Sequence, residues 1–327
     1  MSWQGKRVLV TGAGGFIASH LAERMVKDGA AVRALVHYNA LGSRGWLDES
    51  ILADQIEVLA GDITDRDSVR RAMENVDVVF HLAALIAIPY SYRAPESYVR
   101  TNINGTLNVL QTARDLGTPR VVHTSTSEVY GTALYVPIDE KHPLQGQSPY
   151  SASKIGADMM AESFYRSFDL PVVTVRPFNT FGPRQSARAV IPTIISQCLQ
   201  QGQVRLGSLT PTRDLNFVTN TVDGFVLAAQ APAAIGQVIN LGSGREISIG
   251  DLAALIARLT GIAFDVESET ARLRPEKSEV NRLLADHTRA TELLGWTPRV
   301  TLEEGLVQTI DWIRENLDRY RPHEYTV

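Results

Sequence analysis

The residues with the clearest chemical potential are a tyrosine and a lysine four positions apart, Tyr150 and Lys154. This spacing places both side chains on one face of a helix, and the sequence holds no second Tyr-x-x-x-Lys. A phenol is a weak base at neutral pH, but a nearby ammonium group lowers its pKa. Tyr150 could then take the proton of an alcohol while the carbinol carbon loses a hydride. The alternative is a Tyr and Lys pair on a helix surface with no chemical role.

A glycine loop near the start of the chain offers a site for a second reactant. The apolar run Val8 to Val10 is followed by Thr11-Gly12-Ala13-Gly14-Gly15 and then by an apolar helix start. In a strand-turn-helix unit, such glycines allow a tight turn and let a pyrophosphate approach the helix N-terminus. A second pair, Gly42 and Gly45, follows no strand and is interpreted as loop. We predict a dinucleotide site, against the alternative of a plain turn, with these contact residues: Gly12, Gly14, Gly15, Phe16 and Ile17.

The end of the second predicted strand bears on the type of dinucleotide. It lacks the Asp or Glu that usually binds the ribose hydroxyls of NAD, and Arg33, His37 and Arg44 lie near it in the sequence. We therefore predict NAD(P), tightly bound and recycled, with NADP slightly favoured over NAD. Asp62, after the third strand, could accept a hydrogen bond from the adenine amino group or could stabilise a turn.

These residues need a scaffold that brings the ends of several strands together. Short β-rich runs alternate with stretches of helical period, which indicates repeated strand-helix-strand units. The runs are nearly continuously apolar, as expected when helices cover both faces of a sheet. We predict an α/β fold with a doubly wound parallel (Rossmann) sheet. The runs are Val8 to Val10, Val32 to Val36, Ile56 to Leu59, Val76 to Leu82, Val121 to Thr124 and Val172 to Val175.

Beyond Pro177 the elements become shorter and are separated by prolines, which indicates a second, smaller lobe. We expect residues 1–178 to form the dinucleotide-binding domain and residues 179–327 to form most of a sugar-nucleotide-binding domain. Two later runs within residues 213–242, Leu215 to Val218 and Val238 to Leu241, are predicted to rejoin the first sheet. Glycines at helix C-termini and one capping box, from Thr301 to Glu304, mark helix ends. The glycines are Gly29, Gly117 and Gly261.

Composition excludes several classes of protein. Apolar residues make up 44% of the 327 residues and charged residues 21%, as in globular and not in disordered chains. The net charge is −4, without a block of like charge, so we expect neither nucleic-acid binding nor attachment to a membrane. The single cysteine, Cys198, excludes an internal disulfide and a cysteine metal cluster, and no metal site is predicted. Without a signal-peptide pattern or a membrane-length apolar run, we expect a cytoplasmic protein.

On these motifs the chain resembles the extended short-chain dehydrogenase/reductases, specifically their nucleotide-sugar branch, almost from end to end. Besides the glycine loop and the Tyr-Lys pair, the resemblance rests on Asn102 and on the segments His81 to Ala84, Arg176 to Arg184, Arg213-Asp214 and Arg274-Pro275. It implies further cofactor contacts from Ile63, Leu82, Ala83 and Ala84.

The same resemblance implies a substrate-binding group of residues. In that family Asn179, Arg213 and Arg274 would contact the nucleoside diphosphate, for which charge-assisted donors are suited. Each arginine could instead form a structural ion pair. Ser91 and Arg184 lie in segments that look like those of the NDP-hexosamine 4,6-dehydratases of the legionaminic acid pathway. That group implies a substrate such as GDP- or UDP-linked GlcNAc.

The segment after the fifth strand bears on the reaction. In the related sugar 4,6-dehydratases the residue matching Thr126 binds the C4 oxygen, and the residue matching Glu128 removes the C5 proton. Hydride passes from C4 to the nicotinamide and returns to C6, with loss of water. Ser127 departs from the family pattern, because nucleotide-glucose dehydratases have an Asp there that protonates the leaving C6 hydroxyl. The catalytic residues implied are therefore Tyr150, Lys154, Thr126, Ser127 and Glu128.

Three alternatives stay open. The segment Thr126 to Gly131 is also similar to UDP-glucuronate decarboxylases, which oxidise the same C4 and lose the C6 carboxylate. A nucleotide-sugar 4-epimerase would need the Tyr-Lys pair but no C5 base. A dinucleotide sensor without activity would have little reason to keep Glu128 together with that pair.

An apolar helix also suggests self-association. The predicted helix Tyr150 to Phe168 carries more apolar side chains than one packed face requires. With a helix from about Glu96 to Leu116, it could form an intermolecular four-helix bundle, as the family resemblance implies for a homodimer. A wholly internal core is the alternative.

Overall fold

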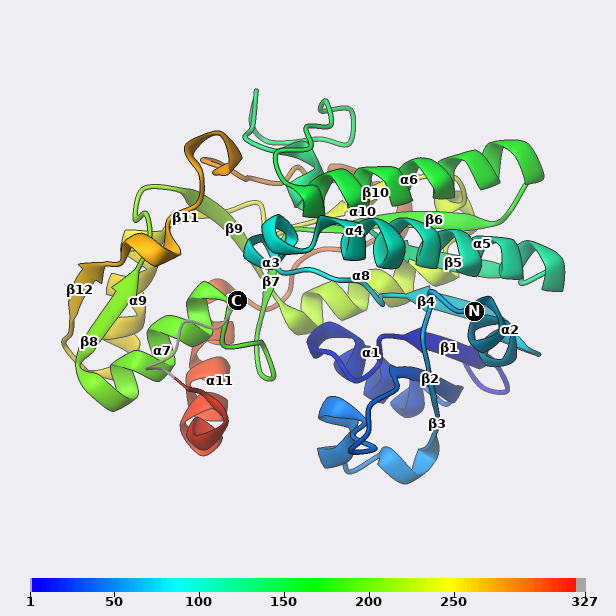
Figure 1. Cartoon of the computed structure of the whole chain (residues 1–327), viewed down its shortest axis with the longest axis horizontal. Coiled ribbons are helices and arrows are strands. Elements are labelled where there is room, and N and C mark those ends of the chain that lie inside the picture. Colours follow the sequence, from blue (N-terminus) through cyan, green and yellow to red (C-terminus); the bar gives the residue numbers. More distant parts are fainter. Residues whose placement is uncertain (1, 322–327) are drawn as a thin grey trace.

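A seven-stranded parallel sheet forms the centre of the protein (Figure 1). The computed structural model describes residues 2–321. The strand order is β3-β2-β1-β4-β5-β6-β10, in which the chain starts in the middle, extends to one edge and then to the other. The prediction of a doubly wound Rossmann sheet is therefore confirmed. The strands are β1 (Arg7–Thr11), β2 (Ala31–His37), β3 (Ile56–Gly61), β4 (Val78–His81), β5 (Arg120–Thr124), β6 (Val172–Pro177) and β10 (Val238–Leu241).

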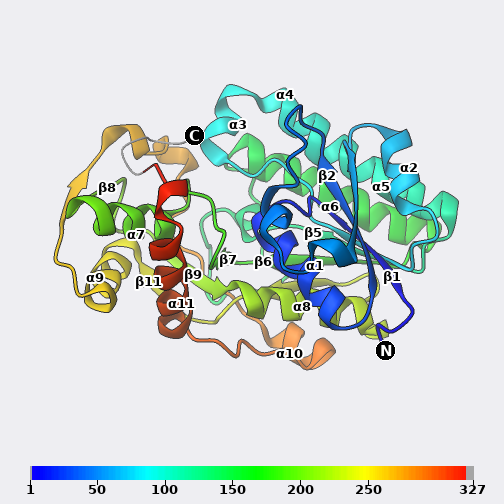
Figure 2. The same ribbon diagram turned by 90° about the horizontal axis from the view of Figure 1, so that it is seen from below.

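Helices cover both faces of this sheet because its strands are apolar on both sides. In β1, Val8 and Val10 pack into one hydrophobic core, whereas Leu9 points to the other. Figure 2 shows α1 and α8 on the face nearer the viewer and α5 and α6 behind the sheet. The covering helices are α1 (Phe16–Lys27), α2 (Arg66–Met73), α5 (Gly105–Leu116), α6 (Pro149–Phe168), α8 (Val218–Gln230) and, beside β10, α10 (Thr288–Leu294).

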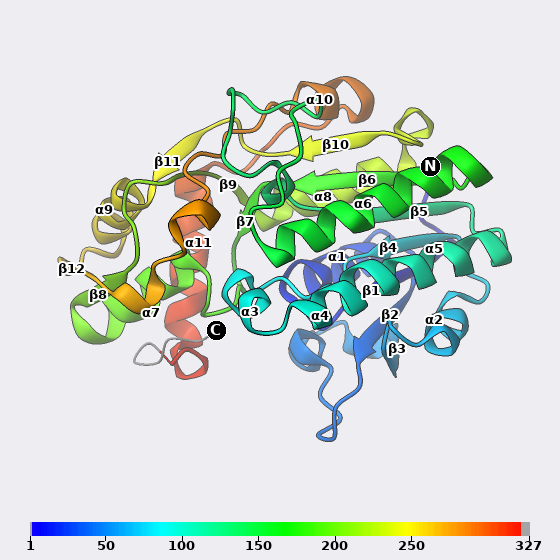
Figure 3. The ribbon, with the colours of Figure 1, turned by 45° about the horizontal axis from the view of Figure 1, so that its top comes forward.

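A smaller lobe lies at one end of the sheet (Figure 3). It contains two small sheets, of order β11-β9-β7 and β12-β8, and three helices that pack on one another. Its strands are β7 (Asn179–Phe181), β8 (Gln203–Leu206), β9 (Thr212–Phe217), β11 (Glu246–Ser248) and β12 (Asp265–Ser268). Its helices are α7 (Val190–Gln201), α9 (Ile249–Thr260) and α11 (Leu302–Glu315).

One of the two late strands does what the sequence predicts and one does not. Val238–Leu241 (β10) joins the main sheet beside β6. Leu215 lies in β9 and pairs with Asn179 of β7, so the prediction that Leu215 to Val218 rejoins the main sheet is wrong. Both segments are short and apolar, and the choice of pairing partner depends on tertiary contacts that a local pattern does not contain.

Helix ends position the Tyr-Lys pair. Ser148 is the N-cap of α6 and forms a capping box with Ser151, in which each side-chain oxygen accepts a hydrogen bond from the backbone N–H of the other residue. Pro149 occupies the first turn. Tyr150 therefore sits at the beginning of α6. The predicted capping box from Thr301 to Glu304 is also present, at the start of α11.

The helix predicted from about Glu96 to Leu116 is interrupted. Two short helices, α3 (Ile88–Arg93) and α4 (Pro95–Tyr98), lead into a π-helical turn at Val99–Asn104, and α5 follows. A π-helical turn inserts an extra residue and re-aims the side chains next to it, often at functional sites. Within the described residues, no helix is long and apolar enough to cross a membrane.

Candidate active site

The glycine turn after β1 packs against the segment after β4 and leads into the N-terminus of α1. Gly12 has φ +69°, and a Cβ there would lie 2.8 Å from the Cα of Ala83. Gly15 is the N-cap of α1; among the described residues no side chain caps this helix, and its first turn holds no acidic residue. The backbone N–H groups at this helix N-terminus are thus open to a negatively charged ligand. These features fit the pyrophosphate of a dinucleotide. Phe16 and Ile17 form the first turn and pack partly into the core.

A second loop packs against this turn. The N–H of Trp46 donates to the carbonyl oxygen of Gly14 at 3.0 Å. A Cβ at Gly14 would lie 2.7 Å from the carbonyl oxygen of Arg44. Gly45, interpreted from the sequence as ordinary loop, therefore belongs to the surroundings of the glycine turn. Its sequence signal, a glycine between Arg44 and Trp46, was too local to reveal which segment it would meet.

The ends of β1 and β4 form the floor of the predicted cofactor site. The hydroxyl of Thr11, which the sequence pattern did not single out, accepts from the backbone N–H groups of Leu82 (3.1 Å) and Ala83 (3.0 Å). This holds the segment that continues into Ala84 against the glycine turn. Ile63 is buried and packs so closely on α5 that a Cβ at Gly105 would lie 2.6 Å from its Cδ1.

The basic residues expected near a 2′-phosphate lie in different environments. Arg33 donates to Glu57 at 2.9 Å and to the carbonyl oxygens of Ala72 (2.9 Å) and Glu74 (3.0 Å). Because the guanidinium group of Arg33 is engaged in these bonds within the protein, the structure does not support a role for it in NADP binding. Arg44 donates from Nε to Asp48 at 2.9 Å, on the exposed loop that covers the glycine turn.

His37 and Asp62 lie together at the ends of β2 and β3. The Nε2 of His37 is 3.6 Å from Oδ2 of Asp62, and both side chains are exposed. Asp62 also accepts from the N–H of Thr64 at 2.8 Å, which is the turn-stabilising role considered for it. Its second oxygen faces solvent and His37, so a carboxylate lies close to the end of β2 although none belongs to that strand.

Tyr150 and Lys154 are both buried, on the same face of α6. The Nζ of Lys154 donates to the carbonyl oxygen of Thr124 at 2.6 Å. Burial lowers the pKa of Lys154 to about 8, and the charge of Asp158 opposes this effect. Burial raises the pKa of Tyr150 above its ordinary value; the neighbouring negative charge of Glu128 adds to this, and a hydrogen bond with the side chain of Thr126 opposes it. Tyr150 therefore needs additional positive charge before it can act as a base.

Thr126, Ser127 and Glu128 follow β5 on a 3₁₀ turn. Thr126 caps this turn by accepting from the N–H of Glu128 at 3.2 Å. Ser127 is 1% exposed and Glu128 8%. The Glu128 carboxylate is close enough to Tyr150 and to Arg213 to influence the pKa of each. A carboxylate, a phenol and a hydroxyl are thus gathered at one place.

Two arginines meet one glutamate on the substrate side of the site. The Nη2 of Arg213 is 3.2 Å from Oε1 of Glu279, and the Nη1 of Arg274 is 3.6 Å from the same oxygen. Arg274 Nη1 and the Oδ1 of Asn179 are buried, and the described residues offer neither a hydrogen bond of standard geometry. Buried polar groups without a hydrogen bond are rare in protein interiors unless water, an ion or a ligand completes them. Glu279 was not identified from the sequence.

The other two predicted substrate contacts are used within the protein. Ser91 is fully buried and donates to the carbonyl oxygen of Ile88 at 2.7 Å, inside α3. Arg184 donates to Ser19 at 3.2 Å and to Glu23 at 2.8 Å, both on α1. The structure thus gives Arg184 a role in joining the smaller lobe to the helix that follows the glycine turn.

Asn102 holds together two segments next to the Tyr-Lys pair. Its side-chain amide accepts from the N–H of Leu85 at 2.8 Å and donates to the carbonyl oxygen of Leu85 (3.0 Å) and to Ser153 Oγ (2.9 Å). It therefore links the segment after β4 with the first turns of α6, and the π-helical turn aims it there.

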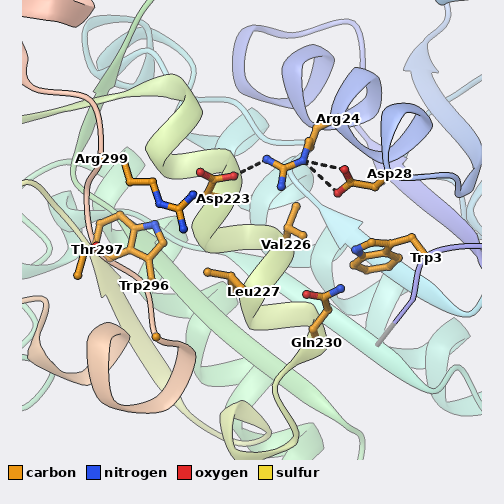
Figure 4. Close-up of a pocket in the computed structure, with 11 residues that line it drawn as sticks. Trp3, Arg24, Asp28, Asp223, Val226, Leu227, Gln230, Trp296, Thr297 and Arg299 are labelled. Atoms are coloured by element: carbon orange, nitrogen blue, oxygen red, sulfur yellow. Dashed lines mark hydrogen bonds and ion pairs between the residues drawn. The ribbon is translucent and has the colours of Figure 1, made fainter.

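A pocket elsewhere in the protein has a different character. It has a volume of about 240 Å³ and lies between the C-terminal end of α1, α8 and residues 295–299. Figure 4 shows Arg24 there between Asp28 and Asp223, bonded to both. The end of α1 that lines it is the one remote from the glycine turn, so we do not assign the chemistry to it.

Fold and site together define a dinucleotide-dependent short-chain dehydrogenase/reductase of the extended type. The family model "GDP-mannose 4,6 dehydratase" matches residues 9–309. The UDP-glucose 4-epimerase of Mycolicibacterium smegmatis is 36% identical over 94% of this chain and 98% of that protein. The dTDP-glucose 4,6-dehydratase of Streptomyces antibioticus is 32% identical over 96% and 94%.

A solved structure supports the same assignment. DesIV, a dTDP-glucose 4,6-dehydratase from Streptomyces venezuelae with NAD and TYD bound, has a TM-score of 0.88 and 30% identity over 97% of this chain and 100% of that one. The chain belongs to the GDP-mannose 4,6-dehydratase family, within the NAD-dependent nucleotide-sugar dehydratases, epimerases and decarboxylases of the extended short-chain dehydrogenase/reductases.

Proposed function

We propose that the protein is a nucleotide-sugar 4,6-dehydratase, which converts an NDP-hexose or NDP-hexosamine to the 4-keto-6-deoxy sugar. The observation that carries this proposal is Glu128, a buried carboxylate beside Tyr150 and Thr126. Oxidation at C4 alone requires the phenol, the ammonium group and the hydroxyl. Elimination across C5 and C6 also requires a base for the C5 proton, and Glu128 can supply it.

Oxidation at C4 would use three side chains. Thr126 holds the C4 oxygen, and Tyr150 takes the hydroxyl proton. Lys154 would stabilise the tyrosinate together with the positive charge of an oxidised nicotinamide, against the burial that raises the pKa of Tyr150. A dinucleotide held at the glycine turn would supply the hydride acceptor for C4 and the hydride donor for C6.

Glu128 and Ser127 would act in the elimination, in which C5 loses a proton and C6 loses its hydroxyl group. The C4 ketone makes the C5 proton acidic, so Glu128 removes it and the C6–O bond breaks. The departing hydroxyl needs a proton to leave as water, and a serine is too weak an acid to supply it alone. Glu128 would therefore pass its proton to that oxygen, oriented by Ser127. When C6 is reduced, C5 takes up one proton, which balances the proton that Tyr150 took from the C4 hydroxyl. The overall change is loss of one water.

We propose a hexosamine linked to a nucleoside diphosphate, GDP- or UDP-GlcNAc, as the substrate. Arg213 and Arg274 carry the charge for a diphosphate, and the unpaired Oδ1 of Asn179 can accept from the substrate. The sugar itself rests on the resemblance of whole segments to hexosamine dehydratases. In this proposal residues 1–178 bind the dinucleotide and residues 179–327 supply most of the substrate contacts.

A 4-epimerase is the second candidate, because one relative of 36% identity has that name. A UDP-glucuronic acid decarboxylase is a third, since a relative from Xenopus tropicalis is 32% identical. All three reactions begin with oxidation at C4, and they differ in the fate of the 4-keto intermediate.

The product mass separates the three reactions. Purified protein with its dinucleotide is given GDP-GlcNAc, UDP-GlcNAc, dTDP-glucose and UDP-glucuronate, and the products are measured by mass spectrometry. We expect a product lighter by one water from a GlcNAc nucleotide. Loss of carbon dioxide from the uronate would identify the decarboxylase, and an unchanged mass with an inverted C4 would identify the epimerase.

We also propose a homodimer built through α5 and α6. Phe164 of α6 is buried and Met160 packs partly into the core, which accounts for part of the excess apolar surface by internal packing. Met159 and Phe168 are 43% and 48% exposed, and Val99 of the π-helical turn is 48% exposed. Met159 and Phe168 lie on α6, which packs beside α5 and the π-helical turn (Figure 3).

A further inference from the structure

A third polar residue lies on the face of α6 that carries Tyr150 and Lys154. Asp158 follows Lys154 by four positions and is 3% exposed. Its Oδ1 accepts from His123 Nε2 at 3.0 Å. Its Oδ2 accepts from Ser125 Oγ (2.7 Å) and from Arg176 Nε (3.1 Å) and Nη2 (2.9 Å). Asp158 thus holds β5 and β6 against α6 directly behind the catalytic pair.

The position of Asp158 matters because few neighbouring groups can compensate the buried charge of Lys154. Lys154 is 4% exposed, and an ammonium group so far from water loses most of its solvation. From β4 and β5 it faces His81 and His123, whose pKa values burial lowers below 6.5, so both rings are neutral at pH 7. Neither ring can compensate its charge.

The remaining ionisable groups differ in sign. Arg176 on β6 is a cation, and Tyr150 is neutral in the resting protein. The charge of Glu128, on the 3₁₀ turn, acts on the pKa values of Tyr150 and Arg213. The Asp158 carboxylate is the negative charge that acts on Lys154, against the effect of burial. Burial alone would raise the pKa of Asp158, but the hydrogen bond from His123 and the charge of Arg176 hold it at about 2.

We propose that Asp158 is a positioning residue that keeps Lys154 protonated and thereby keeps Tyr150 competent as a base. It acts through Lys154 and touches neither sugar nor dinucleotide. Through Ser125 it also fixes the residue immediately before Thr126, so one carboxylate orders both sides of the oxidation site. This inference deepens the proposed function but rests only on its C4 oxidation, which a dehydratase, an epimerase and a decarboxylase share.

Direct titration of Lys154 tests the proposal without turnover. The chain has five lysines, so lysine-selective ¹³C labelling gives a simple NMR spectrum, and Lys154→Arg identifies the buried signal. In the full-length, dinucleotide-free protein we expect Lys154 to titrate near pH 8. In Asp158→Asn, which keeps the shape and removes the charge, the midpoint should fall by at least about one pH unit.

Ser125→Ala is the matched control, because it removes a hydrogen bond to the same carboxylate and leaves the charge. Its Lys154 midpoint should stay within about 0.3 units of wild type. If Asp158→Asn does not fold, Asp158→Glu, which retains the charge, should titrate close to wild type. An unchanged midpoint in Asp158→Asn, a fall in Asp158→Glu, or an equal fall in Ser125→Ala would each overturn the proposal.

The pH profile of the reaction gives a second readout. In Asp158→Asn the alkaline limb of kcat/KM should move to lower pH, because Lys154 loses its proton earlier, while KM changes little. A merely structural role would lower activity equally at every pH.

Discussion

The carbonyl oxygen of Gly14 occupies the space that a side chain at position 45 would need: a Cβ on Gly45 would lie 2.3 Å from it. Gly45 also has φ +64°, which L side chains rarely adopt. The loop at residues 44–46 can therefore approach the glycine turn only with glycine at this position. Gly42 has φ +67° but open space around its missing Cβ.

This pair of glycines gives a matched test of the cofactor site. Both Gly42→Ala and Gly45→Ala should destabilise the fold by about 1–2 kcal/mol through backbone strain. Only Gly45→Ala must also push the loop away from Gly14, so we expect it alone to weaken dinucleotide binding, by about tenfold. Isothermal titration calorimetry with NAD measures the binding. Equal losses in the two variants would show that the loop does not shape the site.

Glu128→Gln should separate oxidation from elimination. The amide keeps the shape of the side chain but cannot take the C5 proton, so product formation should fall by about 100-fold or more. Oxidation at C4 should continue, and the reduced dinucleotide should accumulate, which its absorbance reports during a single turnover.

Tyr150→Phe is the control for this experiment. It lacks the group that takes the first proton, so neither product nor reduced dinucleotide should form. If Glu128→Gln turned over at the wild-type rate while Tyr150→Phe was inactive, the C5 base would lie elsewhere and the dehydratase proposal would lose its main support.

Local spacing predicted that Tyr150 and Lys154 share one face of a helix, and it predicted most of the main sheet. Tyr150 and Lys154 are related by one helical turn, and the apolar runs contain their own evidence for strands. The contacts that were not predicted depend on which residues face each other across neighbouring strands or segments. Arg33 was expected to face a phosphate, but its cross-strand partner on β3 is Glu57, and the two side chains form an ion pair. The ion pair of Arg184 with Glu23 and the close approach of Gly45 to Gly14 were not predicted either, because in each case the partner comes from a distant segment.

The choice between NADP and NAD should depend on Arg44 and not on Arg33. Arg33 already donates to Glu57 and to backbone carbonyls, whereas Arg44 lies on the loop over the glycine turn, with an exposed partner in Asp48. We expect both dinucleotides to bind. Arg44→Gln should weaken NADP relative to NAD by up to about fivefold, as for an exposed charge, and Arg33→Gln should leave the ratio of their Kd values unchanged.

Two measurements check this expectation. Denaturing the purified protein and identifying the released dinucleotide gives the one that it carries, and titration of the dinucleotide-free variants gives the ratio. If only NAD is released and NADP does not bind, the absence of a carboxylate at the end of β2 has no bearing on selectivity.

The homodimer can be tested at Met159, which is 43% exposed on α6. Placing a charge there should cost the interface more than it costs the monomer, so Met159→Lys should shift light scattering from dimer to monomer at micromolar concentration. Ile51→Lys is a suitable control, because Ile51 is 94% exposed and belongs to neither α5 nor α6. A wild-type protein that is already monomeric would contradict the proposed assembly.

The position of β10 has a consequence for synthesis of the chain. All six residues of β6 are buried in the finished protein, and β10, from residue 238, covers its outer edge. While the ribosome is still making the intervening segment, that edge has no neighbour and presents unpaired backbone groups of an apolar strand. A nascent chain that stops short of Val238 is therefore open to edge-to-edge association at β6, and pairing with β10 covers that edge.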